Sequence, residues 1–328
     1  MTTRERSNRR LWLQAAGALT LAGAGLSPAR AQGDIVRIML GFPAGSSVDV
    51  IARVMAPHMS KTLGKNVIVE NKPGASGTIA IRQLEQMGPE SQTYSFYPTT
   101  TMMGFVLQGQ EPVLEKISVL TEMYEQFSIF AINPNLPLVA NVKTLKDLVD
   151  VARANPGAIN YSSAGVGSIS HLTTEKLCNL TGTKMQHIAY KGSQPALQDF
   201  FAGQLHLVVM DPTNLVAHLN TPRLRAIALN YPQRMPYMPD VPTTAEAGYK
   251  ELASVVATVM FVGPPNLPDD QFRTMQQAVH QAIADPALNK RMQELYALPK
   301  TSTGPEARAL MQRDLAFWKK VISENGIK

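Results

Sequence analysis

The stretch 41-GFPAGSSVDV-50 joins a short apolar run, 35-IVRIML-40, to a segment with helical periodicity over 47–63. A strand that passes through a small polar turn into a helix is the repeating unit of α/β proteins. The same pattern returns in 160-NYSSAGVGSISHL-172 and in 189-AYKGSQPALQDF-200. These three stretches predict an α/β protein.

The first turn combines residues that shape the backbone with residues that begin a helix. Pro43 fixes φ, and Gly45 permits a conformation that is closed to most other residues. Ser46 or Ser47 can cap the helix, and Asp49 lies in its first turn, where a carboxylate offsets the positive helix end. Such a turn can leave backbone N–H groups free to bind an anion. The spacing favours an anion site and an empty structural turn equally.

Two sharper interpretations of the first turn fail on spacing. A phosphate-binding P-loop needs G-x-x-x-x-G-K-[ST], and no lysine follows the glycine here. A nucleophile elbow needs G-x-S-x-G, and neither Ser46 nor Ser47 has glycines on both sides at that spacing.

Strand-like and helix-like segments alternate along the rest of the chain. The predicted strands cover 34–40, 66–71, 93–98, 127–132, 158–163, 185–190, 205–210, 224–229 and 254–262. The predicted helices cover 47–63, 77–87, 144–154, 168–180, 194–202, 213–219, 243–247, 268–296 and 304–324. This alternation favours largely parallel sheets.

Two proline-rich breaks, 133-NPNLP-137 and 230-NYPQRMPYMPDVP-242, divide the chain. We predict one lobe from 33–131 plus 230–328 and a second lobe from 132–229. A lobe built from both ends of the chain requires two crossings between the lobes. Two crossings form a hinge, and the cleft between the lobes is the expected ligand site.

The N-terminus has the three parts of a secretory signal peptide. A basic segment, 4-RERSNRR-10, precedes an apolar one, 11-LWLQAAGALTLAGAGL-26, and Ala29 and Ala31 form an A-x-A cleavage signal. The apolar segment is too short and too rich in small residues for a membrane-spanning helix. We predict that residues 1–31 are removed on export. The Arg9–Arg10 pair resembles a twin-arginine signal.

Charge and composition exclude several classes of protein. The predicted signal peptide takes five of the 31 basic residues and one of the 25 acidic residues, which leaves a net charge of +2. No block rich in lysine and arginine remains, so we predict no nucleic-acid partner. Cys178 is the only cysteine, so no intrachain disulfide can form. An exported protein without disulfides fits a bacterial periplasm.

The remaining reactive side chains allow more than one interpretation. The six histidines show no metal-ligand spacing, and no cofactor fingerprint is present, so we predict no metal and no cofactor. His171 fits a packing histidine, or the base of a hydrolase that uses a nearby serine. Tyr190 and Lys191 fit a solvated turn or a ligand contact. Asp211 ends an apolar strand, where it can orient a turn or accept from a ligand.

Six stretches together resemble the Bug family, the periplasmic solute-binding proteins of tripartite tricarboxylate transporters. They are 42-FPAGSSVDVIAR-53, 67-VIVENKPGASGTIA-80, 161-YSSAGVGSISHLTTE-175, 190-YKGSQPALQDFFAGQL-205, 239-PDVPTTAEAG-248 and 318-WKKVISENGIK-328. The resemblance covers nearly the whole mature chain. It implies a type II periplasmic-binding-protein fold, with two α/β lobes around a hinged ligand cleft. The implied ligand is a small carboxylated molecule, such as a di- or tricarboxylate, an aromatic acid or an acidic amino acid.

The resemblance also implies which residues hold the ligand. From lobe 1 these are Phe42, Ala44, Gly45, Ser46, Ser47 and Asp49. From lobe 2 they are Ser163, Ala164, Gly165, Val166, Gly167, Ser168 and His171, with Tyr190, Lys191, Gly192 and Asp211 near them. None is expected to be catalytic.

The implied protein is a periplasmic monomer that serves integral-membrane transporter subunits. A ligand-loaded accessory of a membrane sensor kinase fits the same resemblance. A periplasmic hydrolase remains the other alternative.

The chain departs from the family pattern at several positions. Ser46 and Ser193 stand where the family usually has glycine. The usual D-G-Y-T region is here 89-PESQTY-94, and a tryptophan usual near the last long strand is missing from 256-VATVMFVG-263. We expect these changes to affect the identity of the ligand more than the fold.

Overall fold

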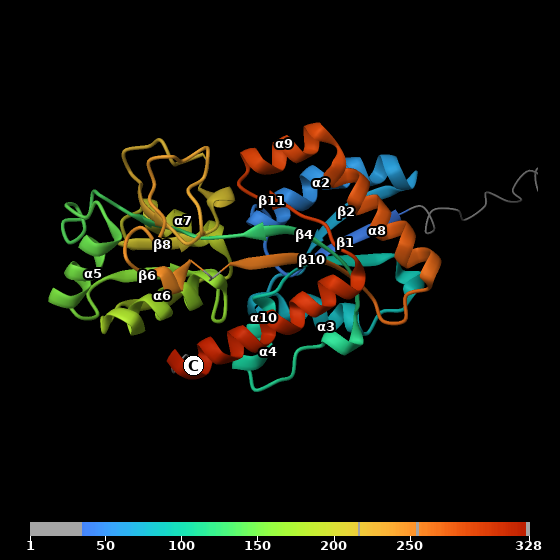
Figure 1. Ribbon diagram of the computed structural model, residues 1–328, viewed down its shortest axis with the longest axis horizontal. Helices are drawn as coiled ribbons and strands as arrows, with labels where there is room; N and C mark the ends of the chain where they lie inside the picture. The colour runs from blue at the N-terminus through green and yellow to red at the C-terminus, as the bar shows by residue number, and fades with distance from the viewer. Residues whose placement is uncertain (1–34, 216, 254–255, 326–328) are drawn as a thin grey trace, which may run out of the picture. The chain divides into compact units, whose positions relative to one another are not determined.

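The computed structural model describes residues 35–215, 217–253 and 256–325, and Figure 1 shows the order of its elements. The signal peptide predicted at 1–31 lies outside these residues. The strands are β1 Ile35–Leu40, β2 Asn66–Asn71, β3 Thr93–Pro98, β4 Ser118–Gln126, β5 Ile129–Ile132, β6 Asn160–Ser163, β7 Gln186–Ala189, β8 Leu207–Met210, β9 Arg225–Leu229, β10 Ala257–Gly263 and β11 Leu298–Pro299. The helices are α2 Ser47–Leu63, α3 Thr78–Glu85, α4 Thr101–Leu107, α5 Leu145–Ala154, α6 Ile169–Thr181, α7 Ser193–Phe201, α8 Asp269–Ala284, α9 Pro286–Glu294 and α10 Gly304–Asn325.

The strands form two mixed sheets. The first sheet has the order β11-β4-β10-β3-β1-β2, and the second has the order β7-β6-β8-β5-β9. β1 runs parallel to β3, and β6 runs parallel to β7 and β8. However, β10 is antiparallel to β3 and β4, and β5 is antiparallel to β8 and β9. The prediction of largely parallel sheets is therefore wrong, because β10 and β5 run opposite to both of their neighbours inside the sheets and β11 also pairs antiparallel with β4.

Helices cover both faces of each sheet (Figure 1). In the first sheet, α2, α8 and α9 pack on one face, and α3, α4 and α10 pack on the other. In the second sheet, α5 and α6 cover one face, and α7 covers the other together with the loops around Leu215 and Met238. Trp318, a residue of α10, is fully buried. Covered faces explain why the strands are apolar on both sides.

The nine-residue strand β4 was not predicted from the sequence. Its buried apolar residues are Val119, Leu120, Met123 and Tyr124, a spacing closer to a helix than to a strand. The structure explains this spacing, because the pairing of β4 with β10 shifts register twice. At each register shift, β4 has one extra residue. Two neighbouring residues of β4 can then be buried together, whereas neighbouring residues of a regular strand point to opposite faces of the sheet.

Several predicted helices are also wrong. The segment 268–296 is two helices, because Pro286 begins α9 directly after the α8 end. The segment 213–219 has only the 3₁₀ turn Pro212–Asn214 in its described part, and 243–247 forms turns. In the latter, Thr243 and Glu246 exchange capping hydrogen bonds, but Gly248 follows too soon for a helix to continue. The short helix α4 was missed.

The chain passes between the sheets at two neighbouring points. It leaves the first sheet between Gln126 and Ile129, and it returns between Leu229 and Ala257. The predicted boundary at 131–132 therefore falls inside β5. At the crossing, Ser128 N–H donates to the Asn230 side chain, and Asn230 N–H donates to the Ser128 carbonyl at 2.9 Å. The two connections are thus paired side by side.

Candidate functional site

Three helices begin at one small cavity. It is lined by Ser46 and Ser47 at the start of α2, by Ser168 at the start of α6, and by Gly192 and Ser193 at the start of α7. The first helix follows a strand of the first sheet, and the other two follow strands of the second sheet. A helix start presents unpaired N–H groups and the positive end of the helix dipole. The cavity therefore has the chemistry of an anion site.

The rest of the cavity lining mixes apolar and polar side chains and holds no cation. The further lining residues are Phe42, Val48, Pro98, Thr100, Gln126, Ala164, Ile169, Ser170, Met210, Asp211 and Asn214. Asp211 is the only charged residue among those that line it. Within the described part of the chain, the hydroxyls of Ser46, Ser47, Thr100 and Ser193 donate to no acceptor. These hydroxyl groups are available as hydrogen-bond donors to a ligand.

Asp49 holds the first turn in shape. Its backbone N–H donates to Ser46 Oγ at 3.4 Å, and its carboxylate accepts from Gly45 N–H at 2.9 Å. The same carboxylate accepts from Arg53 and from Asn71. Burial raises the pKa of Asp49, but the hydrogen bonds from Arg53, Gly45 and Asn71 outweigh it and lower this pKa below its usual value. The Asp49 carboxylate thus stabilises the turn through hydrogen bonds, and it does not line the cavity.

His171 supports the second turn in a similar way. Its Nδ1 accepts from Gly167 N–H at 3.2 Å, and its ring stacks on His187 with 4.2 Å between centroids. His187 in turn shares a 2.7 Å hydrogen bond with Ser163 Oγ. Burial lowers the pKa of both histidines to about 4, and the charge of His171 adds to this effect on His187. Both rings are neutral near pH 7, and neither lines this cavity.

The hydrolase interpretation requires His171 to activate a serine. In the described part of the chain, the ring of His171 makes no hydrogen bond to a serine of the cavity. Its observed hydrogen bond is to the Gly167 backbone, so the geometry favours a structural role.

Asp211 has the first of the two roles that the sequence left open, since it orients a turn. Its carboxylate accepts from Thr213 N–H at 2.8 Å and so begins the 3₁₀ turn after β8. It also lines the cavity. Burial raises the pKa of Asp211 to about 6, although hydrogen bonds from Thr213 and Gln126 oppose this rise. Gln126 also donates to Ser47 Oγ at 3.0 Å, which ties this side of the cavity to α2.

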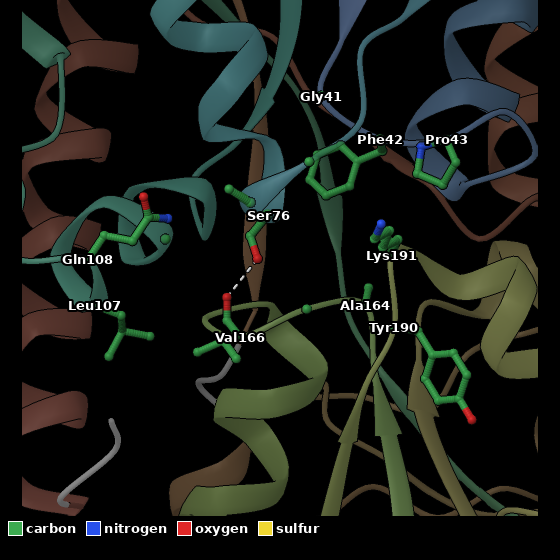
Figure 2. Close-up of a pocket in the computed structure, with 14 residues that line it drawn as sticks. Gly41, Phe42, Pro43, Ser76, Leu107, Gln108, Ala164, Val166, Tyr190 and Lys191 are labelled. Carbon is green, nitrogen blue, oxygen red and sulfur yellow. Dashed lines mark hydrogen bonds between the residues drawn. The ribbon is translucent and has the colours of Figure 1, made fainter.

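A second cavity adjoins the first. It has a volume of about 270 Å³ and shares Phe42 and Ala164 with the first cavity (Figure 2). Its other lining residues are Gly41, Pro43, Gly74, Ala75, Ser76, Gly104, Leu107, Gln108, Gly165, Val166, Tyr190 and Lys191. Lys191 is exposed and forms no ion pair with any described residue. Tyr190 instead donates to Asp199 at 2.7 Å.

Loops that follow strands of the two sheets touch each other beside these cavities. Ser76 Oγ donates to the Val166 carbonyl at 2.6 Å, as the dashed line in Figure 2 shows. Gln194 Nε2 donates to the Gly45 carbonyl at 2.8 Å. The two cavities are therefore bounded by residues that follow strands of both sheets.

The structure brings most of the predicted site residues together. Those that line one or both cavities are Phe42, Ser46, Ser47, Ala164, Gly165, Val166, Ser168, Tyr190, Lys191, Gly192 and Asp211. Those that do not are Ala44, Gly45, Asp49, Ser163, Gly167 and His171.

Other lining residues were missed, and a general rule could have found some of them. Thr100 follows the end of β3, and Gln126 ends β4. Ligands of open α/β sheets bind outside the carboxyl ends of the strands. The rule could not identify Gln126, because the strand that it ends, β4, was not predicted from the sequence. The same rule could have found Ser170 and Asn214, which follow the ends of β6 and β8.

Other kinds of site have little support in the described residues. They contain no group of three or more histidine, cysteine, aspartate or glutamate side chains arranged to hold a metal ion. Across the same residues, no helix is both long enough and apolar enough to cross a membrane. Cys178 is buried, and burial raises the pKa of its thiol to about 11, which opposes nucleophilic chemistry.

Comparison with known proteins gives consistent results. Residues 51–327 match the model of a family described as the tripartite tricarboxylate transporter family receptor. The protein BugT of Bordetella pertussis is 28% identical over 323 residues, covering 97% of this chain and 96% of BugT. The periplasmic binding protein BugD has a similar structure, with a TM-score of 0.82, 26% identity, and coverage of 90% of this chain and 98% of BugD.

A more distant structure supports the fold alone. MatC of Rhodopseudomonas palustris, solved with bound malate, has a TM-score of 0.80 at 24% identity and covers 88% of this chain and 98% of its own. Together these structures confirm the α/β periplasmic-binding-protein fold that the resemblance implied.

Proposed function

Because the chain belongs to the tripartite tricarboxylate transporter receptor family, we propose that it binds a small carboxylate in the periplasm and delivers it to membrane subunits of a transporter. One observation supports this most. The starts of α2, α6 and α7 meet at a cavity that has hydroxyl donors and no cation. A carboxylate is an acceptor-only group with two oxygens, which matches a cavity rich in donors.

The proposed binding is by hydrogen bonds and helix dipoles. Charge-assisted hydrogen bonds from N–H and O–H groups are stronger than neutral ones, so several of them can replace a salt bridge. Ser46 and Ser193 contribute hydroxyls from the starts of two helices that follow strands of different sheets. Asp211 limits how much negative charge the cavity can accept.

We propose that each sheet with its helices is one lobe of a hinged molecule. The lobes are those predicted from the sequence, 33–131 plus 230–328 and 132–229, with the first boundary moved to 127–128, where the chain changes sheets. The paired residues Ser128 and Asn230 form the hinge. A ligand that contacts helix starts of both lobes stabilises their closed arrangement, because it binds that arrangement more tightly.

The remaining parts of the proposal concern export and partners. Residues 1–31 direct the chain to the periplasm and are cleaved, and the mature protein acts as a monomer. Its membrane partners are the integral subunits that accept the released carboxylate.

Calorimetric titration and thermal unfolding with a panel of carboxylates test the proposal. We expect saturable binding without turnover, and stabilisation by about 2.7 kcal/mol at a hundredfold excess over Kd. Ser193→Asp places a carboxylate at the start of α7. It should lower the affinity about a hundredfold by like-charge repulsion, while the helix tolerates it.

The matched control is Gln198→Glu, which adds the same charge on an exposed position of α7 outside both cavities. This variant should bind as the wild type does. If no carboxylate raises the melting temperature of the wild type, or if both variants lose affinity equally, the proposed site is wrong.

A further inference from the structure

The second cavity is larger than the first, about 270 Å³ against about 60 Å³. Its lining is mostly apolar, from Phe42, Pro43, Ala75, Ala164, Leu107 and Val166, and its polar side chains are those of Ser76, Gln108, Tyr190 and Lys191 (Figure 2). Its glycines contribute only backbone. An apolar cavity of about 150 Å³ is enough to hold benzene. With a volume of about 270 Å³, this cavity has room for a substituted ring or a branched chain.

The two cavities together carry very little charge. Lys191 is the only cation and Asp211 the only anion among the residues that line them. Figure 2 shows Lys191 beside Phe42 and Ala164, which line both cavities, whereas Leu107 and the neutral Gln108 lie on the opposite side. One ligand carboxylate is therefore matched by Lys191 and the helix starts. A further carboxylate on the side of Leu107 and Val166 loses hydration and meets no second cation.

Resting on the proposed function, we propose that the preferred ligand is a monocarboxylate with an apolar, ring-sized body. Its carboxylate binds at the helix starts, and its body fills the second cavity against the ring of Phe42. Aromatic rings pack favourably in offset or edge-to-face arrangements. Compact hydroxylated acids with two or three carboxylates fit this arrangement poorly, since their polar groups meet Leu107 and Val166.

Titration of the wild-type protein with benzoate, acetate, malate and citrate at one ionic strength tests this assignment. Benzoate should bind at least about tenfold more tightly than malate or citrate, because its ring leaves water for an apolar surface. Acetate should bind more weakly than benzoate for the same reason. Tighter binding of malate or citrate overturns the inference.

Leu107→Asn tests the apolar body separately from the carboxylate. It should weaken benzoate about tenfold and leave acetate unchanged, since only the ring reaches position 107. The control is Leu180→Asn, at a leucine that is 44% exposed on α6 and lines neither cavity. If Leu107→Asn loses affinity for benzoate and for acetate equally, the apolar body of the ligand does not lie in the second cavity.

Gln108→Lys tests the charge argument with a gain of binding. A second cation on the side opposite Lys191 should raise the affinity for adipate about fivefold, while hexanoate, a monocarboxylate of the same length, changes little. Gln198→Lys is the control for added charge elsewhere. An unchanged ratio of adipate to hexanoate affinity contradicts the single-cation argument.

These outcomes separate the inference from the proposed function. If acetate, benzoate, malate, citrate and adipate all fail to bind, the proposed function itself is wrong. If malate or citrate binds more tightly than benzoate and Ser193→Asp abolishes that binding, the function stands and only the ligand class is wrong.

Discussion

At the scale of single residues, two glycines of the second sheet's turns permit close approach to the first sheet's loops. Gly192 has φ +127°, and a Cβ there would lie 2.4 Å from Pro43 Cγ. Gly165 has φ +129°, and a Cβ there would lie 2.8 Å from Ser76 Oγ. The sequence indicated glycine turns next to helices, which is a local property. It could not indicate Pro43 or Ser76 as neighbours, because these contacts depend on how the chain folds back.

Gly192→Ala should prevent this approach. The added methyl group collides with Pro43, so we expect affinity for the carboxylate that the wild type binds to fall about tenfold or more, with about 1 kcal/mol of backbone strain. Titration and chemical denaturation measure the two effects.

The matched control for this prediction is Gly182→Ala. Gly182 also has a positive φ, +63°, but a Cβ there meets nothing within 4 Å. The Gly182→Ala variant should be less stable than the wild type and should keep the wild-type affinity for the carboxylate. Equal loss of affinity in both variants would show that closeness to Pro43 has no bearing on binding.

At the scale of elements, local signals explain which boundaries were predictable. The predicted helix 47–63 is confirmed as α2, which Ser46 caps and the left-handed Gly64 ends. In contrast, apolar periodicity continues across Asp285 and Pro286. The sequence therefore predicted one helix where the structure has two, α8 and α9. The capping signal was present in the sequence but was outweighed by that periodicity.

The variant Asp285→Ala tests how much the cap at the start of α9 contributes to stability. The carboxylate of Asp285 accepts from the N–H groups of Ala287 and Leu288 at 2.9 and 3.0 Å. Its loss should reduce the free energy of unfolding, because two N–H groups of the first turn of α9 lose their acceptor, and should leave ligand affinity unchanged. Asp240→Ala, at an exposed turn, is the control and should change neither. Denaturation showing the same stability for both variants would contradict the capping role.

At the scale of the whole molecule, the sequence predicted an α/β fold and two crossings but not the direction of the strands. Whether β5 and β10 run parallel or antiparallel to their neighbours depends on connections rather than on apolar pattern. The helix starts of the candidate site were predictable, since strand, turn and helix are consecutive in the chain. The second cavity was not, because Leu107 and Gln108 come from a helix that carried no recognised signal.

Stability of the molecule should fall in mild acid because of the stacked pair His171 and His187. Their pKa values are lowered to about 4 in the folded protein, from an ordinary value of 6.5. The unfolded chain therefore takes up protons first as the pH falls. The stabilising contribution is complete above pH 6.5 and is lost between about pH 6.5 and 4. Glu175, whose charge raises the pKa of His187, opposes part of this loss.

Denaturation at pH 7 and at pH 5 measures this effect. The variant His187→Gln should show a smaller loss of stability between the two values than the wild type, since one of the two titrating groups is gone. His218→Gln, which lies outside the stack, should behave as the wild type does. An equal loss in all three proteins would contradict the role of the stacked pair.

The absence of a cation from the lining of the first cavity has a consequence for the medium in which the protein works. Dissolved salt screens attraction between exposed charges over about 10 Å at 0.1 M, but it has little effect on short hydrogen bonds in a buried cavity. The part of the affinity that comes from helix starts and hydroxyls is then nearly independent of salinity, and only the part that the exposed Lys191 adds is weakened by salt. Such a receptor keeps most of its affinity while the salt concentration outside the cell rises and falls.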